Sequence, residues 1–343
     1  MTRQKAPPRT SRRSSGRVTL DDVSRLAGVS AITVSRALNT PDLVTPETRE
    51  KVRLAVERTG YVPNLLAGGL ASNRSRMVAA VVPTVAGPVF LDTIQALTDA
   101  LGEAGYQLML GQSGYNDSRE DALIDAIIGR RPDGIVLTGI LRSPEARRKL
   151  LASGIPVVET WDITPTPVDM LVGFSHEKVG QAVARFLHER GYRHPGIVTA
   201  DDRRATLRRE SFESTMRDFG ITGIPVFTVP APTALSGGRA ALRHMLAEHP
   251  EVDVLVCSSD ALAHGVITEA HARSLRVPDD IGVMGFGDLA FAQHVHPAIS
   301  TVHIDGSGIG RQAASFIVSR ARDLEIPERI VDVGFSIVAR DSA

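Results

Sequence analysis

Between residues 18 and 62, apolar side chains recur at the three- and four-residue spacing of amphipathic helices. Glycine, proline and small polar residues interrupt this pattern at short intervals. A compact unit of three short helices is therefore expected in this part of the chain. We predict these helices at Leu20–Ala27, at Ala31–Leu38, and from Pro46 to about Thr59.

Each predicted helix follows a residue that can cap its first turn. Thr19 precedes the first helix, and Asp22 stands where it can complete a capping box. Gly28 marks a tight turn, after which Ser30 can cap the second helix. Thr45-Pro46-Glu47 gives a cap, a proline and an acid in the order that helix starts prefer. The capping residues thus support the helices that the apolar spacing predicts.

From Met77 onward, short apolar runs alternate with amphipathic stretches of helical length. This alternation is typical of parallel sheets covered by helices on both faces, and the length allows two Rossmann-like lobes. The expected fold class is α/β, with an all-α head at the amino terminus. The strands are expected at Val78–Val82, Leu108–Leu110, Gly134–Leu137, Pro156–Val158, Gly196–Val198, Val252–Val256 and Ile281–Gly285. The helices are expected to include Phe90–Ala104, Glu177–Arg190, Arg204–Phe219 and Leu235–His249.

The first two helices and their glycine turn have the arrangement of a helix-turn-helix. Val23, Leu26 and Ala27 form the expected buried stripe of the first helix, and Val34 and Leu38 anchor the second helix. The amino-terminal and outer faces of the second helix then remain exposed. A plain three-helix bundle is the alternative interpretation of the same pattern.

The exposed face of the second helix carries side chains that suit the major groove of DNA. Arg36 can bind guanine through two hydrogen bonds, and Ala31 and Ile32 can contact thymine methyl groups. Thr33 and Ser35 are better suited to phosphate oxygens. In a plain bundle, Arg36 would be a solvated surface charge.

Charge is distributed unevenly along the chain, although the 39 Lys and Arg residues balance the 39 Asp and Glu residues. Residues 1–76 carry 14 basic against 6 acidic side chains, and the remaining 267 carry 25 against 33. Residues 1–17 are rich in Arg, Ser and Pro and are expected to form a disordered basic arm. A basic end on an acidic body is typical of a protein that meets a polyanion at that end.

The sequence lacks a secretory signal and any run of 18 apolar residues, which predicts a cytoplasmic protein that does not span a membrane. The single cysteine, Cys257, lies in an apolar run and suits a core position. No metal site is expected, because His294, His296 and His303 have no carboxylate or cysteine partner at ligand spacing. No cofactor is expected either.

The segments VTLDDVSRLAGVSAITVSRALN and TPETREKVRLAVERTGYVPN closely resemble the head of the LacI/GalR family of bacterial repressors. The resemblance extends over essentially the whole chain after residue 17. It implies a sequence-specific DNA-binding regulator that forms a homodimer on a pseudo-palindromic operator. The residues that we expect to contact DNA are Thr19, Ser30, Ala31, Ile32, Thr33, Ser35, Arg36, Asn39, Tyr61, Asn64, Ala67 and Leu70.

The resemblance makes residues 63–76 a hinge that folds on the operator, with Leu70 as a wedge in the minor groove. The segment YVPNLLAGGLASN departs from the family pattern, because Leu65 replaces a polar residue and Gly68-Gly69 lie inside the intended helix. Each glycine costs about 1 kcal/mol in a helix interior. We therefore expect a hinge that is disordered without DNA; a plain flexible linker is the alternative.

The resemblance also implies that residues 77–343 resemble periplasmic sugar-binding proteins, with a small molecule in a cleft between two lobes. One lobe should comprise about 77–174 and 304–331, and the other about 175–303 and 332–343. Ligands of such folds lie at the carboxyl ends of the strands. The candidate ligand-binding residues in these loops are Phe90, Trp161, Asp162, Arg204, Arg208, Ser259, Asp260 and Asp288.

Several of these residues have simpler alternatives. Phe90 can be a core residue, Asp162 and Asp260 can cap helices, and the arginines of the run 203–209 can form a solvated charged face. Arg204 and Arg208 lie one helical turn apart, so they can instead pair with one carboxylate or phosphate.

The combination of GPVF, GYQLML, VVETWD, VGFSHE and GFGD most resembles the gluconate-utilisation repressor branch of the family. Gly287 stands where relatives place an aspartate that binds sugar hydroxyls, and Asp288 follows one position later. A site rich in arginine and lacking one carboxylate suits a sugar acid. A neutral sugar, a phosphorylated sugar and a nucleobase are the alternatives.

A cytoplasmic sugar-processing enzyme is the competing class. The chain has no G-x-S-x-G elbow, no Walker loop and no H-E-x-x-H motif. The glycines of Gly306–Gly310 have the wrong spacing for a dinucleotide-binding loop. We therefore expect a regulator and not an enzyme.

Overall fold

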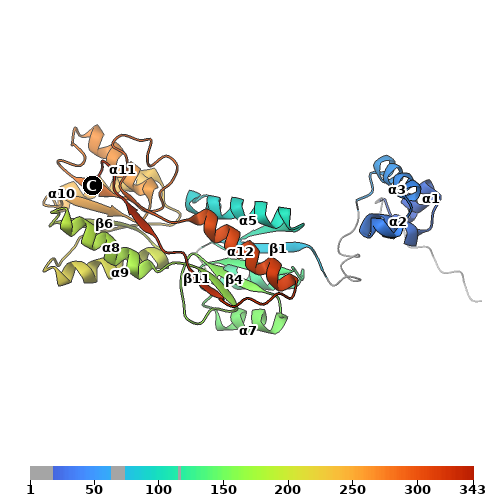
Figure 1. Ribbon diagram of the computed structural model, residues 1–343. Coiled ribbons are helices and arrows are strands. Elements are labelled where there is room, and N and C mark those ends of the chain that lie inside the picture. Colours follow the sequence, from blue (N-terminus) through green and yellow to red (C-terminus); the bar gives the residue numbers. More distant parts are fainter. Residues whose placement is uncertain (1–17, 63–73, 115–116) are drawn as a thin grey trace, which may run out of the picture. The chain divides into compact units, whose positions relative to one another are not determined.

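The computed structural model describes residues 18–62, 74–114 and 117–343, and the chain separates into two compact units, Met1–Ser75 and Arg76–Ala343 (Figure 1). The arm expected at residues 1–17 lies outside the described residues. So do Asn64, Ala67 and Leu70, the residues expected to contact DNA from a hinge, together with Leu65 and Gly68-Gly69.

The first unit contains the three expected helices, α1 (Leu20–Ala27), α2 (Ala31–Asn39) and α3 (Pro46–Thr59), with a 3-10 turn, η1 (Pro41–Leu43), before α3. All three helices begin as the capping residues predict. Thr19 and Asp22 form the capping box, and the side chains of Ser30 and Thr45 accept backbone N–H groups of α2 and α3. Gly28 and Gly60 end α1 and α3 in the left-handed conformation, at φ 68° and 65°. The local sequence therefore determines where each helix starts and where α1 and α3 stop.

The small core of this unit contains Val23 from α1, Val34 and Ala37 from α2, and Val52 and Ala55 from α3. The prediction that Leu26 belongs to the buried stripe is wrong, because its side chain is 49% exposed. The buried face of α1 runs through Leu20, Val23 and Ala27, which are spaced by three and four residues. Leu26 lies at the margin of that face, where its side chain stays largely exposed.

In the second unit, the described residues form a six-stranded parallel sheet in the order β11-β5-β4-β3-β1-β2. Alternate residues of its strands face two helical layers. Val78 and Ala80 pack with α5 and α12 on one face, whereas Ala79 and Val81 pack with α6 and α7 on the other. The elements of this lobe are β1 (Met77–Val82), η2 (Pro88–Phe90), α5 (Leu91–Glu103), β2 (Gln107–Gln112), α6 (Asp117–Ile128), β3 (Gly134–Thr138), α7 (Pro144–Ser153), β4 (Val157–Thr160), β5 (Met170–Gly173), α12 (Gly306–Ala321) and β11 (Ile330–Asp332).

A four-stranded parallel sheet in the order β7-β6-β8-β9 forms the second lobe of this unit. Ile197 faces α8 and α9, and the next residue, Val198, faces α10 and α11. Two sheets with helices on both faces therefore confirm the expected α/β class. The elements of this lobe are α8 (His176–Glu189), β6 (Pro195–Ala200), α9 (Arg203–Asp218), β7 (Val226–Val229), α10 (Leu235–Glu248), β8 (Val254–Cys257), α11 (Asp260–Ala272) and β9 (Gly282–Met284).

Three chain segments run between the lobes. The chain leaves the first sheet after β5 through Phe174-Ser175, and it returns between β10 (Thr301–His303) and α12. It leaves again after β11 and enters β12 (Ser336–Val338), which pairs with β10 in an antiparallel ribbon. The carboxyl ends of both parallel sheets face the region where these segments cross (Figure 1).

The glycines of Gly306–Gly310 have a packing role that their spacing did not reveal. A Cβ atom on Gly310 would lie only 2.4 Å from the carbonyl oxygen of Thr93 on α5. The missing side chain therefore allows α12 to lie directly against α5.

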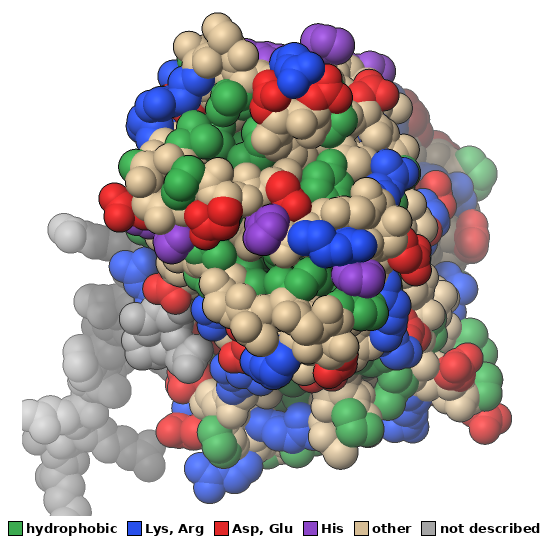
Figure 2. Space-filling view, turned by 90° about the vertical axis from the view of Figure 1, so that its left-hand side faces the viewer, with side chains coloured by type: hydrophobic (Ala, Val, Ile, Leu, Met, Phe, Trp, Pro, Cys, Tyr) green, Lys and Arg blue, Asp and Glu red, His purple; other side chains and the backbone are tan. Residues whose placement is uncertain are grey.

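In the described ranges, no helix is both long enough and apolar enough to span a membrane. The surface in Figure 2 mixes acidic and basic side chains, and its hydrophobic side chains form small scattered groups.

Candidate functional site

The outer face of α2 presents an arginine and apolar side chains next to one another. Ile32 is 66% exposed, Arg36 is exposed, and Ala31 is partly exposed at the helix start. Among the described residues, no hydrogen bond or ion pair engages the Arg36 guanidinium, whose five N–H donors are therefore available to a partner. This face can reach base edges in a groove of DNA.

Some of the other expected DNA contacts already have partners within the head. Thr19 donates to the carboxylate of Asp22, and the hydroxyls of Ser30 and Thr33 lie 2.8 Å apart. The side chain of Asn39 donates to Ser35 Oγ at 3.3 Å. The remaining candidate, Tyr61, is partly buried against the core of the head. These contacts fix the side chains around Ile32 and Arg36.

In the second unit, a cleft that is partly open to solvent lies between the carboxyl ends of the two sheets. Five of the eight expected ligand-binding residues line it, namely Phe90, Trp161, Arg204, Arg208 and Ser259. They come from both lobes, as a site that responds to lobe movement requires. The sequence reasoning missed His176, Asp202, Thr233 and Leu289, which also line this cleft.

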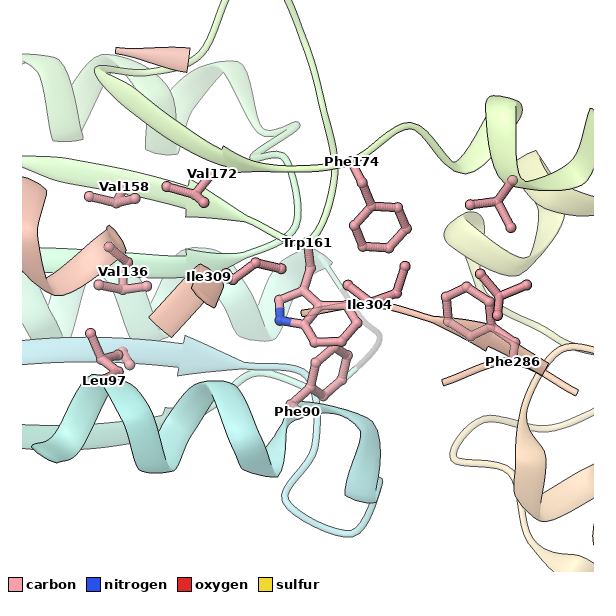
Figure 3. Close-up of a cluster of buried hydrophobic side chains, with 14 of the residues drawn as sticks. Phe90, Leu97, Val136, Val158, Trp161, Val172, Phe174, Phe286, Ile304 and Ile309 are labelled. Atoms are coloured by element: carbon pink, nitrogen blue, oxygen red, sulfur yellow. The ribbon is translucent and has the colours of Figure 1, made fainter. Parts of the chain in front are cut away.

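Trp161 forms the centre of the aromatic wall of the cleft. Its indole contacts the ring of Phe90 edge to face at 5.1 Å and that of Phe174 at 5.8 Å (Figure 3). The indole N–H donates to Thr93 Oγ1 at 3.0 Å, and this hydroxyl donates in turn to the carbonyl of Gly306 at 2.8 Å. Trp161 has a positive φ of 63°, which is uncommon for a bulky residue and is found at constrained sites.

Arg204 and Arg208 project from the first turns of α9 into the cleft. Arg204 lies over the Phe90 ring, with Cζ 5.0 Å from the ring centroid, and its Nη1 is buried without a hydrogen-bond partner. A Cβ atom on Gly139, in the opposite lobe, would be 3.8 Å from this nitrogen. Arg204 therefore reaches from one lobe to the other.

Arg208 lies deeper, and its Cζ is 3.9 Å from the centroid of the Phe286 ring. Burial lowers its pKa to about 10, and Arg204 adds to this effect while Asp202 opposes it. The guanidinium remains charged at neutral pH. Among the ion pairs of the described residues, none includes Arg204 or Arg208. Two cations without a bonded carboxylate make this end of the cleft attractive to an anion.

Arg208 Nη1 is 3.0 Å from the Nδ1 atom of His176, and its Nη2 donates to the carbonyl of Ser258. The other ring nitrogen of His176, Nε2, lies 2.9 Å from the carbonyl oxygen of Trp161. Burial, followed by the charges of Arg208 and Arg204, lowers the pKa of His176 well below its usual value. His176 is therefore neutral in the folded protein at neutral pH.

Asp162 lines a neighbouring polar compartment that is open to solvent and shares Asp202 and Arg204 with the cleft. Its carboxylate accepts the backbone N–H of Ile163, and burial raises its pKa. Ser113 and Thr138 belong to the same compartment. This side of the site offers hydroxyl and carboxylate groups next to Arg204.

Asp260 and Asp288 do not line the cleft. Asp260 is fully buried, and it accepts hydrogen bonds from Thr301 Oγ1 at 2.6 Å and from the backbone N–H of Leu289 at 2.7 Å. Asp288 bonds Arg340 Nη2 at 2.6 Å and lies 3.0 Å from His303 Nδ1. Through these contacts the two aspartates connect the Phe286–Leu289 loop to β10 and to the segment after β12. Phe286 and Leu289 line the cleft, so the aspartates support its wall without lining it themselves. Asp260 is not a cap either, because Ser259 caps α11.

Cys257 is buried in the core of its lobe, which raises the pKa of its thiol. Among the described residues, no group of three or more His, Cys, Asp or Glu side chains is placed to hold a metal ion. The cleft itself offers hydrogen-bonding groups, aromatic surfaces and positive charge to a ligand.

Comparison with known proteins identifies both units. Residues 19–64 match the model of the bacterial regulatory proteins of the lacI family, and residues 184–343 match a periplasmic binding protein-like domain. The chain is 36% identical to the HTH-type transcriptional regulator GntR of Pseudomonas aeruginosa, over 96% of this chain and 97% of that protein.

Two solved structures show the same architecture. A LacI-family transcriptional regulator from Silicibacter pomeroyi matches with a TM-score of 0.90 at 33% identity, covering 95% of this chain and 99% of that one. The transcription regulator GntR from Chromobacterium violaceum matches with a TM-score of 0.74 at 31% identity, covering 78% and 98%. The chain therefore belongs to the lacI family of bacterial regulatory proteins, and it is a DNA-binding transcriptional regulator.

Proposed function

We propose that this regulator is a repressor that releases its operator when a small sugar acid of the gluconate type binds in the cleft. The observation that carries the proposal is the pair of cleft arginines, Arg204 and Arg208, neither of which is ion-paired within the described structure. A carboxylate can accept hydrogen bonds from both guanidinium groups and so satisfy the buried Nη1 of Arg204. A neutral sugar would leave this nitrogen without a charged partner.

The rest of the site suits the polyhydroxyl part of such an acid. The aromatic wall of Phe90 and Trp161 offers apolar surface for the C–H groups of an extended polyol. Asp162, Ser113 and Thr138 in the adjoining compartment offer acceptors and donors for its hydroxyls. The carboxylate end would thus face α9, and the hydroxyl end would face the polar compartment.

In this proposal, each part of the chain has its own role. Residues 1–17 form a basic arm, 18–62 the DNA-reading head, and 63–76 the hinge. Residues 77–343 form the ligand-binding and dimerisation part, with lobes of about 77–174 with 304–331 and about 175–303 with 332–343. Two copies would place two heads on a pseudo-palindromic operator in the cytoplasm. The protein would act by binding and would catalyse no reaction.

Isothermal titration calorimetry on the full chain tests the ligand. Gluconate should bind, and sorbitol, which has the same carbon chain without the carboxylate, should bind at least tenfold more weakly, because a charge-assisted hydrogen bond contributes about 1.5–3 kcal/mol. Arg204→Gln should remove most of this preference. Arg217→Gln is the matched control, because Arg217 is exposed at the far end of the same helix.

Calorimetry with 6-phosphogluconate, ketogluconates and neutral sugars completes the test. The proposal fails if no acid binds, or if sorbitol binds as tightly as gluconate. A strong preference for 6-phosphogluconate would instead assign the arginines to a phosphate group.

A further inference from the structure

His176 has a place in the fold that brings three parts of the site together. It is the first residue of α8, directly after the crossing segment Phe174-Ser175, and it is 2% exposed. Its ring lies 4.7 Å from that of Phe174 and 6.4 Å from that of Phe286. One ring nitrogen faces a carbonyl of the opposite lobe, at Trp161, and the other faces Arg208.

The two contacts of His176 determine its tautomer. A guanidinium group has only donors, so His176 Nδ1 must accept the hydrogen bond from Arg208 Nη1. The ring proton is then on Nε2, which donates to the carbonyl oxygen of Trp161. A second ring proton would break the bond to Arg208 and would place a cation next to a cation. The pair is therefore stable only with a neutral histidine.

Arg208 is consequently held on three sides. Its Nη1 donates to His176, its Nη2 donates to the carbonyl of Ser258, and its guanidinium lies over the ring of Phe286. Both acceptors are neutral. An aspartate or glutamate at position 176 could hold the arginine equally well, but it would also neutralise the charge that an anionic ligand requires. A neutral acceptor orients the guanidinium and leaves its positive charge available.

We propose that His176 is the positioning residue of the effector site: as a neutral acceptor it orients Arg208 toward the carboxylate of the ligand. This inference rests on the proposed function, since it assigns His176 a role toward the acid that Arg208 would bind. Through its Nε2–H, His176 also connects Arg208 to the backbone of Trp161 in the other lobe. Arg208 would therefore be correctly oriented for the carboxylate in only one arrangement of the lobes.

Three substitutions separate orientation from charge. His176→Gln keeps an acceptor and a donor and should bind gluconate within a few fold of the wild type. His176→Leu keeps the bulk but loses the acceptor, and it should bind about tenfold to a hundredfold more weakly. His176→Asp supplies an acceptor with a charge and should bind no better than His176→Leu. His188→Gln is the matched control, because His188 lies on the same helix and stacks on Phe219 at 4.0 Å, outside the cleft.

A double-mutant cycle and NMR make the test specific. In an Arg208→Lys background, His176→Leu should have little further effect on gluconate affinity, because both changes remove the same orientation. Nitrogen NMR of the ligand-free protein should show His176 as the Nε2–H tautomer and neutral at pH 6. These two readouts do not change with a general loss of stability.

The outcomes distinguish this inference from the function on which it rests. If the wild type binds no sugar acid, the proposed function fails, and the role of His176 toward a carboxylate fails with it. If the wild type binds and His176→Leu binds equally well, only the role of His176 is overturned. An Nδ1–H tautomer, additive effects in the cycle, or an undiminished affinity in His176→Asp would overturn it as well.

Discussion

Thr93 connects the aromatic wall of the cleft to the helix that follows the second crossing, and replacing it by valine tests this connection. The substitution preserves the shape of a side chain that is 6% exposed, but it removes the hydroxyl. That hydroxyl accepts from the Trp161 indole at 3.0 Å and donates to the Gly306 carbonyl at 2.8 Å. Both hydrogen bonds are buried and join residues far apart in the sequence.

The cost of Thr93→Val follows from the two partners left behind. The indole N–H is a single donor, and leaving it unsatisfied costs about 1–3 kcal/mol. The carbonyl of Gly306 lies in the first turn of α12 and can keep a helical hydrogen bond, so its loss is nearer 0.5–1 kcal/mol. Together they lower the free energy of unfolding by about 1.5–4 kcal/mol. In a unit of this size, Tm should fall by about 3–16 °C.

Thermal unfolding monitored by Trp161 fluorescence is the assay, because Trp161 is the single tryptophan of the chain. Thr98→Val is the control: Thr98 lies on the same helix, and its hydroxyl donates to the carbonyl of Ile94 at an exposed position. This control should change the free energy of unfolding by less than about 0.5 kcal/mol. Equal shifts in the two variants, or an unchanged Trp161 emission maximum in folded Thr93→Val, would refute the proposed connection.

Three further predictions concern packing, DNA reading and pH. Gly310→Ala should lower Tm by several degrees, because its Cβ would lie 2.4 Å from the Thr93 carbonyl oxygen; an unchanged Tm would show that α12 can move away from α5 at no cost. Arg36→Ala should weaken binding to the preferred DNA site by roughly 1–3 kcal/mol and relax selection at one base pair, and an equal loss on all sequences, measured by fluorescence anisotropy, would make Arg36 a phosphate contact. His176 has a folded-state pKa below its unfolded value of 6.5, so the unfolded state binds more protons and Tm should fall as the pH drops below about 6.5. The fall should be smaller in His176→Gln, and identical pH profiles would exclude His176 as its source.

Much of the head could be predicted from its sequence because its signals are local. The capping box at Thr19, the caps at Ser30 and Thr45, and the left-handed glycines all act within one helical turn. The exposure of Leu26 could not be predicted in the same way, since it depends on how far α2 and α3 extend over α1.

The two sheets could be predicted as a class but not strand by strand. The runs around β1, β3 and β6 are buried on both faces and read as continuous apolar segments. β7, at one edge of its sheet, and the short strands β11 and β12 are only partly buried. Their pairing partners, and not their own composition, define them as strands.

The cleft could be predicted in part, because strand ends point to the correct loops. Phe90, Trp161, Arg204, Arg208 and Ser259 follow strands and line the cleft. Asp260 and Asp288 also follow strands, yet Thr301 of β10 and Arg340, which follows β12, engage them. Only the fold brings those partners together.

The position of His176 in the sequence could have identified it as a candidate site residue. It follows the capping serine Ser175 at a crossing between the lobes, where a buried imidazole would need two polar partners. Its contact with Arg208 joins residues 32 positions apart and could not be read from spacing.

The proposal that a sugar acid in the cleft controls operator binding is tested most directly by measuring whether the ligand releases DNA. A fluorescent duplex, selected for tight binding from a random pool, is bound to the full chain and titrated with gluconate. Anisotropy should fall to that of free DNA with the wild type and with Arg217→Gln, and it should stay high with Arg204→Gln, which should still bind DNA. If gluconate releases DNA equally from the wild type and from Arg204→Gln, or if neither gluconate nor another sugar acid releases it from the wild type, the cleft arginines do not control operator binding through a carboxylate.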